Sequence, residues 1–185
     1  VSAQAAEYTL TVTNGGNMPI SPGVLYASTS GEPESRIGAD SEPGFVKLCQ
    51  TGMNDERAME LKKNTQVKSV VKTAGPILPG ESKTFTIAAN MNEVNGVYFE
   101  TMYGKSKDAC GVVSISRHQL VALSQHIALS VAGKDQVVLS GAFTDPSVGA
   151  DPKTLCAAAA GGVDCLRLMS MEKGGAAQIR AFNGY

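Results

Sequence analysis

The sequence predicts a mainly β fold, an antiparallel β-sandwich with two or three short helices in the connections between strands. Several segments alternate apolar and polar residues and are rich in β-branched side chains, the pattern of a strand with one buried face. The chain contains 20 glycines and 8 prolines, enough to supply many turns. Charged residues make up 18% of the chain, below the roughly 25% usual in soluble domains. Together these features favour a turn-rich β protein over a helical bundle.

The chain of 185 residues is long enough for one domain with a sizeable core, and no linker or internal repeat divides it. We therefore expect residues 8–185 to form a single domain. Residues 1–7 are expected to be an N-terminal arm or the remnant of an export signal. Ala3-Gln4-Ala5 has the small-x-small form of a signal-peptidase site, with a chance alanine-rich start as the alternative.

Strands and turns follow one another through the first part of the chain. Tyr8–Thr13 alternates strictly and stops at Asn14-Gly15-Gly16, so it predicts a strand followed by a turn. A short strand is expected over 24–27, and the polar residues 29–43 predict a long surface loop. The later strands expected before residue 120 are 67–73, 83–87, 97–103 and 111–116.

Two short helices are expected between residues 43 and 64. The apolar residues of the first fall on one helical face: Phe45, Leu48 and Cys49. Asn54 or Asp55 can cap the second, which runs to about Lys63 with Ala58 and Leu61 facing inward. Its charged residues, together with Lys62 and Lys63, predict a solvated face.

The C-terminal third gives weaker signals. Residues 120–131 fit a strand or a helix, and 136–142 predict a strand. Asp151-Pro152 starts an expected helix that ends at Gly161. Residues 166–171 and 177–182 predict a final hairpin.

Net charge and hydropathy exclude two classes of partner. The chain carries 16 basic and 17 acidic side chains, well mixed, for a net charge of −1. This balance provides no basic field, so we expect no nucleic-acid partner. No apolar run approaches the length of about 20 residues that crosses a bilayer, so no transmembrane segment is expected.

The chain has four cysteines, an even number that fits an oxidising compartment. Cys156 and Cys165 are close in sequence and flank an Ala/Gly turn, which makes them a natural local pair. Cys49 and Cys110 would then close a long loop. Three connectivities are open, and we prefer this one. No Cys-x2-Cys or Cys/His spacing indicates zinc.

Catalytic motifs are missing from the sequence. The two histidines, His118 and His126, lie eight residues apart and fit ordinary structural or surface roles better than a base or ligand role. Ser69-Val70-Val71-Lys72 matches Ser-x-x-Lys, but it falls in an expected strand and lacks the partner motifs of that chemistry. We therefore expect a protein that is not an enzyme.

Calcium is the candidate ion, because hard cations bind several loop oxygens. The acidic residues in or beside expected loops are Asp108, Glu100, Asp145 and Asp151. Solvated loop acids are the simpler interpretation, since no EF-hand spacing organises them. Met169 and Met171 alternate on a strand and could bind Cu(I), although core packing is the more common role of methionine.

Three stretches carry a family resemblance. The first is the strand Tyr8–Asn14 followed by Pro19-Ile20-Ser21-Pro22, the second is the Pro-Gly-Glu turn and strand of Leu78–Ile87, and the third is Met102–Gly111. They resemble segments of the bacterial spondin-domain family, a secreted β-sandwich group, whose third segment has the form Met-x-x-x-Thr-Asn-Asp-x-Phe-x-Gly. The likeness is best over residues 8–115 and poor in the C-terminal third. It implies a spondin-like sandwich.

Two departures from the family pattern introduce cysteine. Cys49-Gln50 stands where the family has an Ala-Glu pair in its mid-chain helix, and Cys110 stands at the family's aromatic position. The resemblance therefore implies that a Cys49–Cys110 disulfide replaces a packed contact between that helix and that loop.

Two functions from different classes follow. The first is a self-assembling structural subunit of an extracellular fibre or matrix, whose partner is itself and whose N-terminal arm adds a strand to a neighbour. The second is a recognition or adhesion module for cell-surface or matrix components. In both cases the expected location is bacterial, either secreted or periplasmic.

Overall fold

The computed structural model describes residues 6–14, 19–35, 42–90, 92–104, 109–118, 136–143, 167–171 and 179–182. The expected segments 120–131 and 151–161 lie outside these residues. Strands in the described part are β1 (Ala6–Asn14), β2 (Val24–Ser28), β3 (Val67–Lys72), β4 (Ser82–Ala89), β5 (Gly96–Met102), β6 (Ala109–Ser116), β7 (Gln136–Phe143), β8 (Arg167–Met171) and β9 (Ile179–Phe182). The helices are α1 (Pro43–Thr51) and α2 (Asp55–Lys63).

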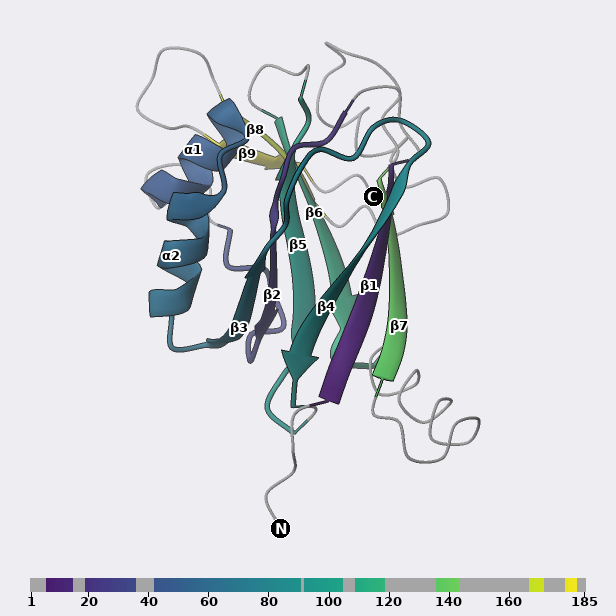
Figure 1. Ribbon diagram of the computed structural model, residues 1–185. Coiled ribbons are helices and arrows are strands. Elements are labelled where there is room, and N and C mark those ends of the chain that lie inside the picture. The colour runs from purple at the N-terminus through teal and green to yellow at the C-terminus, as the bar shows by residue number, and fades with distance from the viewer. Residues whose placement is uncertain are drawn as a thin grey trace.

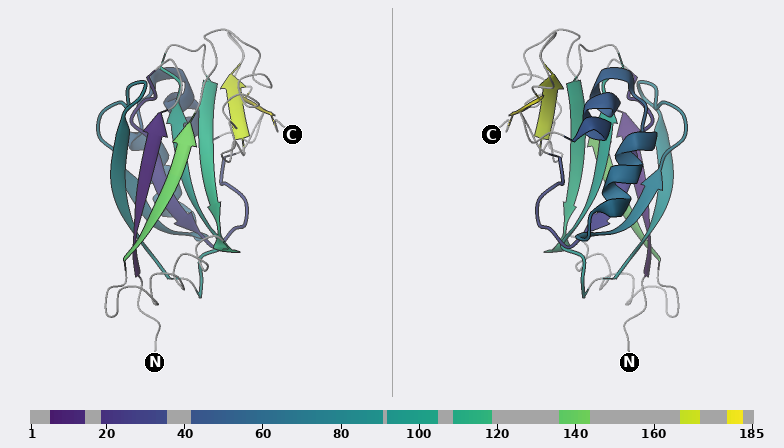
Figure 2. Two further views of the ribbon diagram at one scale, coloured as in Figure 1. Left: turned by 90° about the vertical axis from the view of Figure 1, so that its right-hand side faces the viewer. Right: turned by 90° about the vertical axis from the view of Figure 1, so that its left-hand side faces the viewer.

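These elements form three layers (Figure 1). One sheet has three strands in the order β4-β1-β7, and the other has six in the order β3-β2-β5-β6-β8-β9. The two helices cover the face of the large sheet that points away from the small sheet, as the right-hand view of Figure 2 shows. The predicted β-sandwich with short helices in its connections is therefore confirmed.

Among the described strands, the pairing that departs from the antiparallel expectation lies in the small sheet. β1 pairs with β4 antiparallel, from Ala6 opposite Ala89 to Thr13 opposite Ser82. On its other side β1 pairs with β7 in parallel, from Glu7 opposite Gln136 to Asn14 opposite Phe143. Parallel neighbours need a long crossover connection, and here most of the chain lies between the two strands. Ala6 and Glu7 belong to β1, so the strand starts two residues earlier than expected.

The large sheet is antiparallel at each pairing between described strands. The expected C-terminal hairpin is confirmed, since β8 and β9 pair from Leu168 opposite Phe182 to Met171 opposite Ile179. This hairpin extends the sheet beyond β6, at the side where α1 lies (Figure 1).

Two hydrophobic layers hold the three structural layers together. Between the sheets, Phe99 of β5 stacks on Phe85 of β4 with ring centroids 5.9 Å apart, and Tyr8 and Val12 of β1 are fully buried. Between the large sheet and the helices lie two clusters. The disulfide cluster consists of Phe45, Leu48, Cys49, Met102, Cys110 and Val112. The tyrosine cluster consists of Val24, Tyr26, Ala58, Leu61 and Tyr98.

The second helix starts and ends where the sequence predicts, and the inward residues expected in both helices are buried. Asn54 occupies the cap position of α2, but its side chain makes no capping hydrogen bond there. Its Nδ2 instead donates to the carbonyl oxygens of Gly23 at 2.8 Å and Thr73 at 3.0 Å, so it ties α2 to the ends of β2 and β3. Neither described helix is long and apolar enough to cross a membrane.

Candidate functional site: a buried charged network beneath the helices

The most concentrated chemistry in the described residues lies between the helices and the large sheet, where the two clusters meet. Arg57 of α2 is fully buried there, next to Ala58 and one turn before Leu61 on the same helical face. Its partner Glu100 projects from the middle of β5 and is also fully buried. A charge so deep in an apolar layer needs a partner of opposite sign, and each residue supplies one to the other.

The contact between these two side chains is bidentate. Arg57 Nε donates to Glu100 Oε1 at 2.7 Å, and Arg57 Nη2 donates to Oε2 at 3.1 Å. The planar guanidinium matches a carboxylate in this fork geometry, which fixes the orientation of both groups. The Arg57 Cζ atom also lies 4.9 Å from the centroid of the Phe45 ring of α1, a cation–π contact.

Tyr26 of β2 extends the network toward the loop after β2. Its hydroxyl donates to Glu100 Oε2 at 3.3 Å and accepts the backbone N–H of Glu34 at 2.9 Å. The Glu34 carboxylate is itself buried and accepts from Ser28 Oγ at 2.9 Å and Asn64 Nδ2 at 3.1 Å. The network therefore links α2, β5, β2 and the segment that follows β2.

Burial and charge shift the pKa values of two members. Burial in itself lowers the pKa of Arg57, but the charge and hydrogen bonds of Glu100 more than offset this and hold it above its ordinary value. Burial raises the pKa of Tyr26 well above its ordinary value, and the nearby Glu100 carboxylate raises it further. Arg57 is therefore held charged and Tyr26 held protonated.

Glu60 of α2 connects this network to the start of α1. Its carboxylate accepts the backbone N–H groups of Gly44 and of Phe45, the latter at 3.2 Å. These amides belong to the first turn of α1, whose N–H groups have no partner within the helix. Glu42 precedes that turn without capping it, and its carboxylate contacts Arg57 Nη1 at 3.3 Å. The acidic cap for α1 therefore comes from the neighbouring helix, where it also complements the helix dipole.

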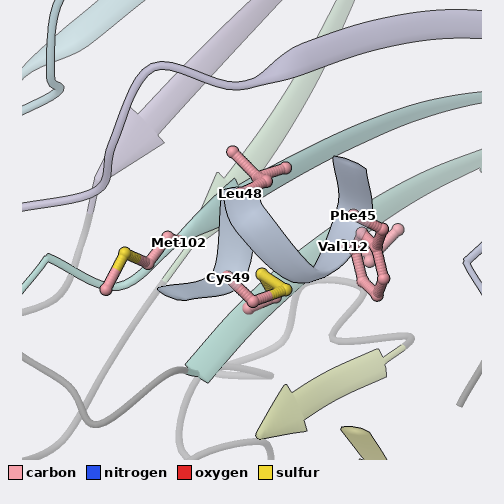
Figure 3. Close-up of a cluster of buried hydrophobic side chains, with 6 residues drawn as sticks. Phe45, Leu48, Cys49, Met102 and Val112 are labelled. Carbon is pink, nitrogen blue, oxygen red and sulfur yellow. A yellow bond between two sulfur atoms is a disulfide. The ribbon is translucent and has the colours of Figure 1, made fainter. Parts of the chain in front are cut away.

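A disulfide fixes the other end of α1 to the sheet. Cys49 near the end of α1 is joined to Cys110 of β6, with the two Cα atoms 5.2 Å apart. Figure 3 shows the bond beneath α1, among Phe45, Leu48, Met102 and Val112. The pairing of Cys49 with Cys110 is the one expected from the sequence, although Cys110 lies in β6 and not in a loop. Cys156 and Cys165 lie outside the described residues, so their pairing stays a prediction.

The arrangement of these polar groups is typical of a structural network that holds the helices on the sheet. Each carboxylate of the network accepts hydrogen bonds from the scaffold, and the guanidinium and phenol have partners as well. A catalytic site needs a nucleophile and a base with room for a reacting atom between them. Here the donors and acceptors face one another directly and lock the helices to the sheet.

The proposed calcium ligands are not brought together by the described structure. The expectation that Glu100 lies beside a loop is wrong, since it sits in mid-strand and uses both carboxylate oxygens on Arg57. A buried carboxylate needs a partner of opposite charge, and Arg57 of α2 supplies it here. Asp108, Asp145 and Asp151 are outside the described residues. Across the part of the chain that is described, no group of three or more metal-ligating residues occurs.

The remaining candidate residues from the sequence are the two histidines, the Ser-x-x-Lys pair and two methionines. His118 is exposed just after β6, and His126 is outside the described residues. Ser69 Oγ donates to the carbonyl of Ala88 at 2.6 Å, whereas Lys72 pairs with Asp55 at 2.6 Å, so the Ser-x-x-Lys residues serve different partners. Met169 and Met171 lie in β8, and their side chains are outside the described part.

Sequence reasoning missed Arg57, Tyr26 and Glu34. Arg57 lies in a helix whose other charged residues are mostly exposed, and helical spacing favours Ala58 and Leu61 as the buried positions. A usable signal was present in β5, where Glu100 is the only charged residue of a strand that reads Gly-Val-Tyr-Phe-Glu-Thr-Met. A lone carboxylate in such a strand predicts a buried cation from a neighbouring element.

Comparisons with known proteins leave the family open. No protein-family model matches the sequence, and no curated protein matches it. A crystal structure of the T6SS lipoprotein TssJ1 from Pseudomonas aeruginosa aligns with a TM-score of 0.39 and 9% sequence identity, covering 76% of this chain and 88% of that one. The bacterial spondin-domain resemblance stays a prediction.

Proposed function

We propose that this chain is an exported, non-enzymatic protein that associates with copies of itself as a subunit of an extracellular fibre or matrix. The observation that carries the proposal is the open architecture of the sandwich. Among the strands that the structure describes, both sheets end in edge strands and neither sheet closes into a barrel. An open edge presents backbone N–H and C=O groups that can pair with a strand of another molecule.

The disulfide supports export. Cys49 and Cys110 are fully buried and bonded to each other at the interface of α1 with β6. Such structural disulfides form and persist in oxidising compartments and are rare in the cytosol. A bacterial location outside the cytoplasm, either secreted or periplasmic, therefore remains the proposed one, and a relationship to the bacterial spondin-domain group belongs to the same proposal.

The buried network supports a non-enzymatic role. Its carboxylates, guanidinium and phenol are used to hold α1 and α2 on the sheet, as described above. The strongest charge interactions of the described residues stabilise the scaffold. This arrangement suits a structural or binding role, in which the surface contacts the partner and the interior keeps the surface in place.

The mass of the purified protein in solution tests self-association. We expect sedimentation velocity and multi-angle light scattering to show species larger than the monomer, whose fraction grows with protein concentration, and negative-stain images to show ordered assemblies. A single monomeric species up to millimolar concentration would contradict the proposal. Non-reducing peptide mapping checks the export argument, since it should recover Cys49 and Cys110 in one linked peptide from protein made in an oxidising compartment.

One observation favours recognition as a second function. The segment 74–81 between β3 and β4 exposes Pro76, Leu78 and Pro79, with Leu78 at 44% exposure. Its backbone is nevertheless held rigidly, because Ile77 exchanges both backbone hydrogen bonds with Ile20 at 3.0 and 2.9 Å. A rigid loop with an exposed apolar tip loses little entropy on binding, which suits adhesion to a cell-surface or matrix component.

A panel of immobilised matrix proteins and glycans tests this second function. We expect a Leu78→Ser variant to lose binding that the unaltered protein shows. Met59→Ser is the matched control, because Met59 is 57% exposed but lies on α2, away from the loop. Equal binding by the Leu78→Ser variant and the unaltered protein would exclude this loop as the recognition surface.

A further inference from the structure

The parallel pairing of β1 with β7 determines how the fold responds to a pull on its chain. β1 is the middle strand of the small sheet, with β4 on one side and β7 on the other. Its register with β7 runs without a shift from Glu7 opposite Gln136 to Asn14 opposite Phe143. The left-hand view of Figure 2 shows the two strands pointing the same way. The start of β1 and the end of β7 therefore lie at opposite ends of one ladder.

A ladder of hydrogen bonds resists force according to where the force enters. When two strands are pulled apart from the same end, the hydrogen bonds break one after another, and each in turn carries the whole load. When the strands are pulled lengthwise from opposite ends, all the hydrogen bonds are loaded together. A single backbone hydrogen bond contributes only about 1 kcal/mol net, so the number that share the load decides the resistance.

Tension along the chain loads this ladder lengthwise. A pull on the chain before β1 enters the described fold at Ala6, where β1 starts, and a pull on the chain after β7 enters at Phe143, where β7 ends. Because the two strands are parallel, these points separate along the strand axis, and β1 has to slide past β7. It has to slide past β4 at the same time, because β1 also pairs with that strand from Ala6 to Thr13.

The C-terminal hairpin offers less resistance to the same pull. Figure 1 shows β8 and β9 at the opposite end of the molecule from the start of β1. β8 has four register pairs with β6, and β9 has four with β8. Phe182, which ends β9, is opposite Leu168 of β8, so tension on Phe182 separates the hairpin from that pair onward. Once the hairpin has opened, the load reaches Phe143 along the backbone.

We propose that the parallel β1–β7 ladder is a mechanical clamp, through which this protein bears tension along its chain. The inference deepens the proposed function and rests on it for its use, since a subunit of a fibre or matrix carries load. The disulfide complements the clamp. Cys49 and Cys110 both lie between β1 and β7 in sequence, so their bond keeps 61 positions of chain from extending after β1 has slid free.

Pulling single molecules in two geometries tests the clamp. Handles at residues 1 and 185 of the oxidised protein load β1 lengthwise against β7. The matched control has handles at residue 1 and at the exposed Asn92, which follows β4. Ala89 is opposite Ala6, so the control pulls β1 and β4 from the same end. At equal pulling speed, we expect the highest force peak to be at least roughly twofold larger in the first geometry.

The length released identifies which part of the fold resists. After the highest peak of the first geometry, the disulfide lies in the stretched chain, and a thiol reductant can cleave it. An extended chain measures about 3.3–3.6 Å per residue, so cleavage should add about 200–220 Å for the 61 positions that the disulfide spans. A highest peak after which the reductant adds no such length would place the resistance outside the segment between β1 and β7 and overturn the clamp.

Two variants separate the clamp from overall stability. Val12 is fully buried in β1, and Leu61 is buried on α2. Both Val12→Ala and Leu61→Ala should lower the urea midpoint. α2 is still in place when β1 starts to slide, so Leu61→Ala destabilises the folded protein and the transition state alike and leaves the peak force unchanged. Val12→Ala should lower the peak force, because it loosens β1 itself.

The outcomes distinguish the clamp from self-association. Equal forces in the two pulling geometries, or an equal loss of force in the two variants, would overturn the clamp. Single molecules are measured, so these results do not depend on whether copies associate, which sedimentation velocity tests. A protein that is monomeric in solution but resists lengthwise pulling would overturn the fibre proposal and leave the clamp standing.

Discussion

Arg57 and Glu100 form a pair whose energetic meaning depends on which partner is removed. Both side chains are fully buried, and their fork contact lies between two apolar clusters. Removing water from two charges costs several kcal/mol, so an intact pair of this kind adds little net stability, while a broken pair is strongly destabilising. Its main contribution is to fix the position of α2 on β5.

Neutralising Glu100 alone should therefore be costly. We expect Glu100→Gln to lower the free energy of unfolding by about 3–5 kcal/mol, because Arg57 keeps its charge without its main partner. The double variant Arg57→Met, Glu100→Leu should lose much less, since neither partner of the pair is left as an unpaired buried charge. Urea unfolding of the single and double variants measures both values, and a double variant as unstable as Glu100→Gln would contradict this explanation.

Tyr26 should make stability depend on alkaline pH. Its ordinary pKa is 10.0, and burial raises the folded-state value well above that. Above about pH 10 the unfolded chain releases this proton while the folded protein keeps it, so the free energy of unfolding falls as pH rises. Below about pH 10 both states hold the proton, and this contribution to stability is fully present.

The Tyr26→Phe variant isolates this effect. At neutral pH it should be less stable by about 1–2 kcal/mol, because the N–H of Glu34 and the carboxylate of Glu100 each lose a hydrogen-bond partner. Between pH 9 and pH 11 the free energies of unfolding of the two proteins should become equal. The unaltered protein loses stability as the pH rises, whereas the variant has no phenol at position 26 to titrate. Urea unfolding at a series of pH values checks this, and a constant difference up to pH 11 would contradict it.

At the scale of elements, three interactions at different positions hold the two helices to each other and to the large sheet. Glu60 caps the start of α1, the disulfide fixes its end, and Asn54 ties the start of α2 to the sheet. The crossing of the two helices depends on Gly44. A Cβ atom at that position would lie 2.6 Å from the backbone nitrogen of Arg57 and from Glu60 Oε2.

The Gly44→Ala variant should consequently reverse the usual effect of this substitution. Replacing glycine by alanine within a helix ordinarily stabilises it by about 0.5–1 kcal/mol. Here the added atom meets the backbone of α2, which forces the helices apart at a cost of about 1–3 kcal/mol. Gly31→Ala is the control, because nothing lies within 4 Å of its Cβ position. Thermal unfolding compares the two, and equal melting temperatures would show that the crossing has room for the methyl group.

Removing the disulfide tests the covalent tie. Cys49 and Cys110 are separated by 61 residues, a loop for which the loop-entropy model gives about 4 kcal/mol of stabilisation. We expect the Cys49→Ala, Cys110→Ala double variant to lose about that amount in urea unfolding. A loss below about 1 kcal/mol would mean that the unfolded chain is already restricted between these positions.

Element by element, the sequence predicts what local periodicity encodes. The strict alternation of Tyr8–Thr13 and the helical spacing of Phe45, Leu48 and Cys49 identified both the element and its buried face. Hydrophobic periodicity identifies the buried face of an element, but it does not identify the element that packs against that face. It could not show that Arg57 of α2 is buried against the sheet, because that depends on Glu100, which lies 43 positions further along the chain.

At the scale of the molecule, the two sheets are joined by aromatic packing. Phe99 is fully buried and stacks on Phe85 from the opposite sheet. We expect Phe99→Ala to cost about 3–5 kcal/mol through lost burial and the cavity that remains. Phe85→Ala should cost less, because Phe85 is only partly buried. Urea unfolding gives both values, and the reverse order would show that the cavity at position 99 collapses.

The overall architecture was predictable as a class, whereas the partners of β1 were not. Composition and strand spacing predict a sandwich, since turn-rich alternating strands have few other ways to bury one face. The parallel pairing of β1 with β7 follows from the path of the whole chain, which no local window contains. The expected position of Glu100 beside a loop was wrong for a similar reason, because position along the chain does not show which neighbouring element packs against a strand.

That parallel pairing also sets an order of events during synthesis. Asn14 of β1 pairs with Phe143 of β7, so β1 leaves the ribosome long before its parallel partner is made. At about 5–20 residues per second, the intervening chain takes on the order of ten seconds to appear. Throughout that interval β4 is the described strand with which β1 can pair, so the side of β1 that later meets β7 stays available to other chains. A factor that holds nascent or newly translocated chains apart would act on this protein in that interval.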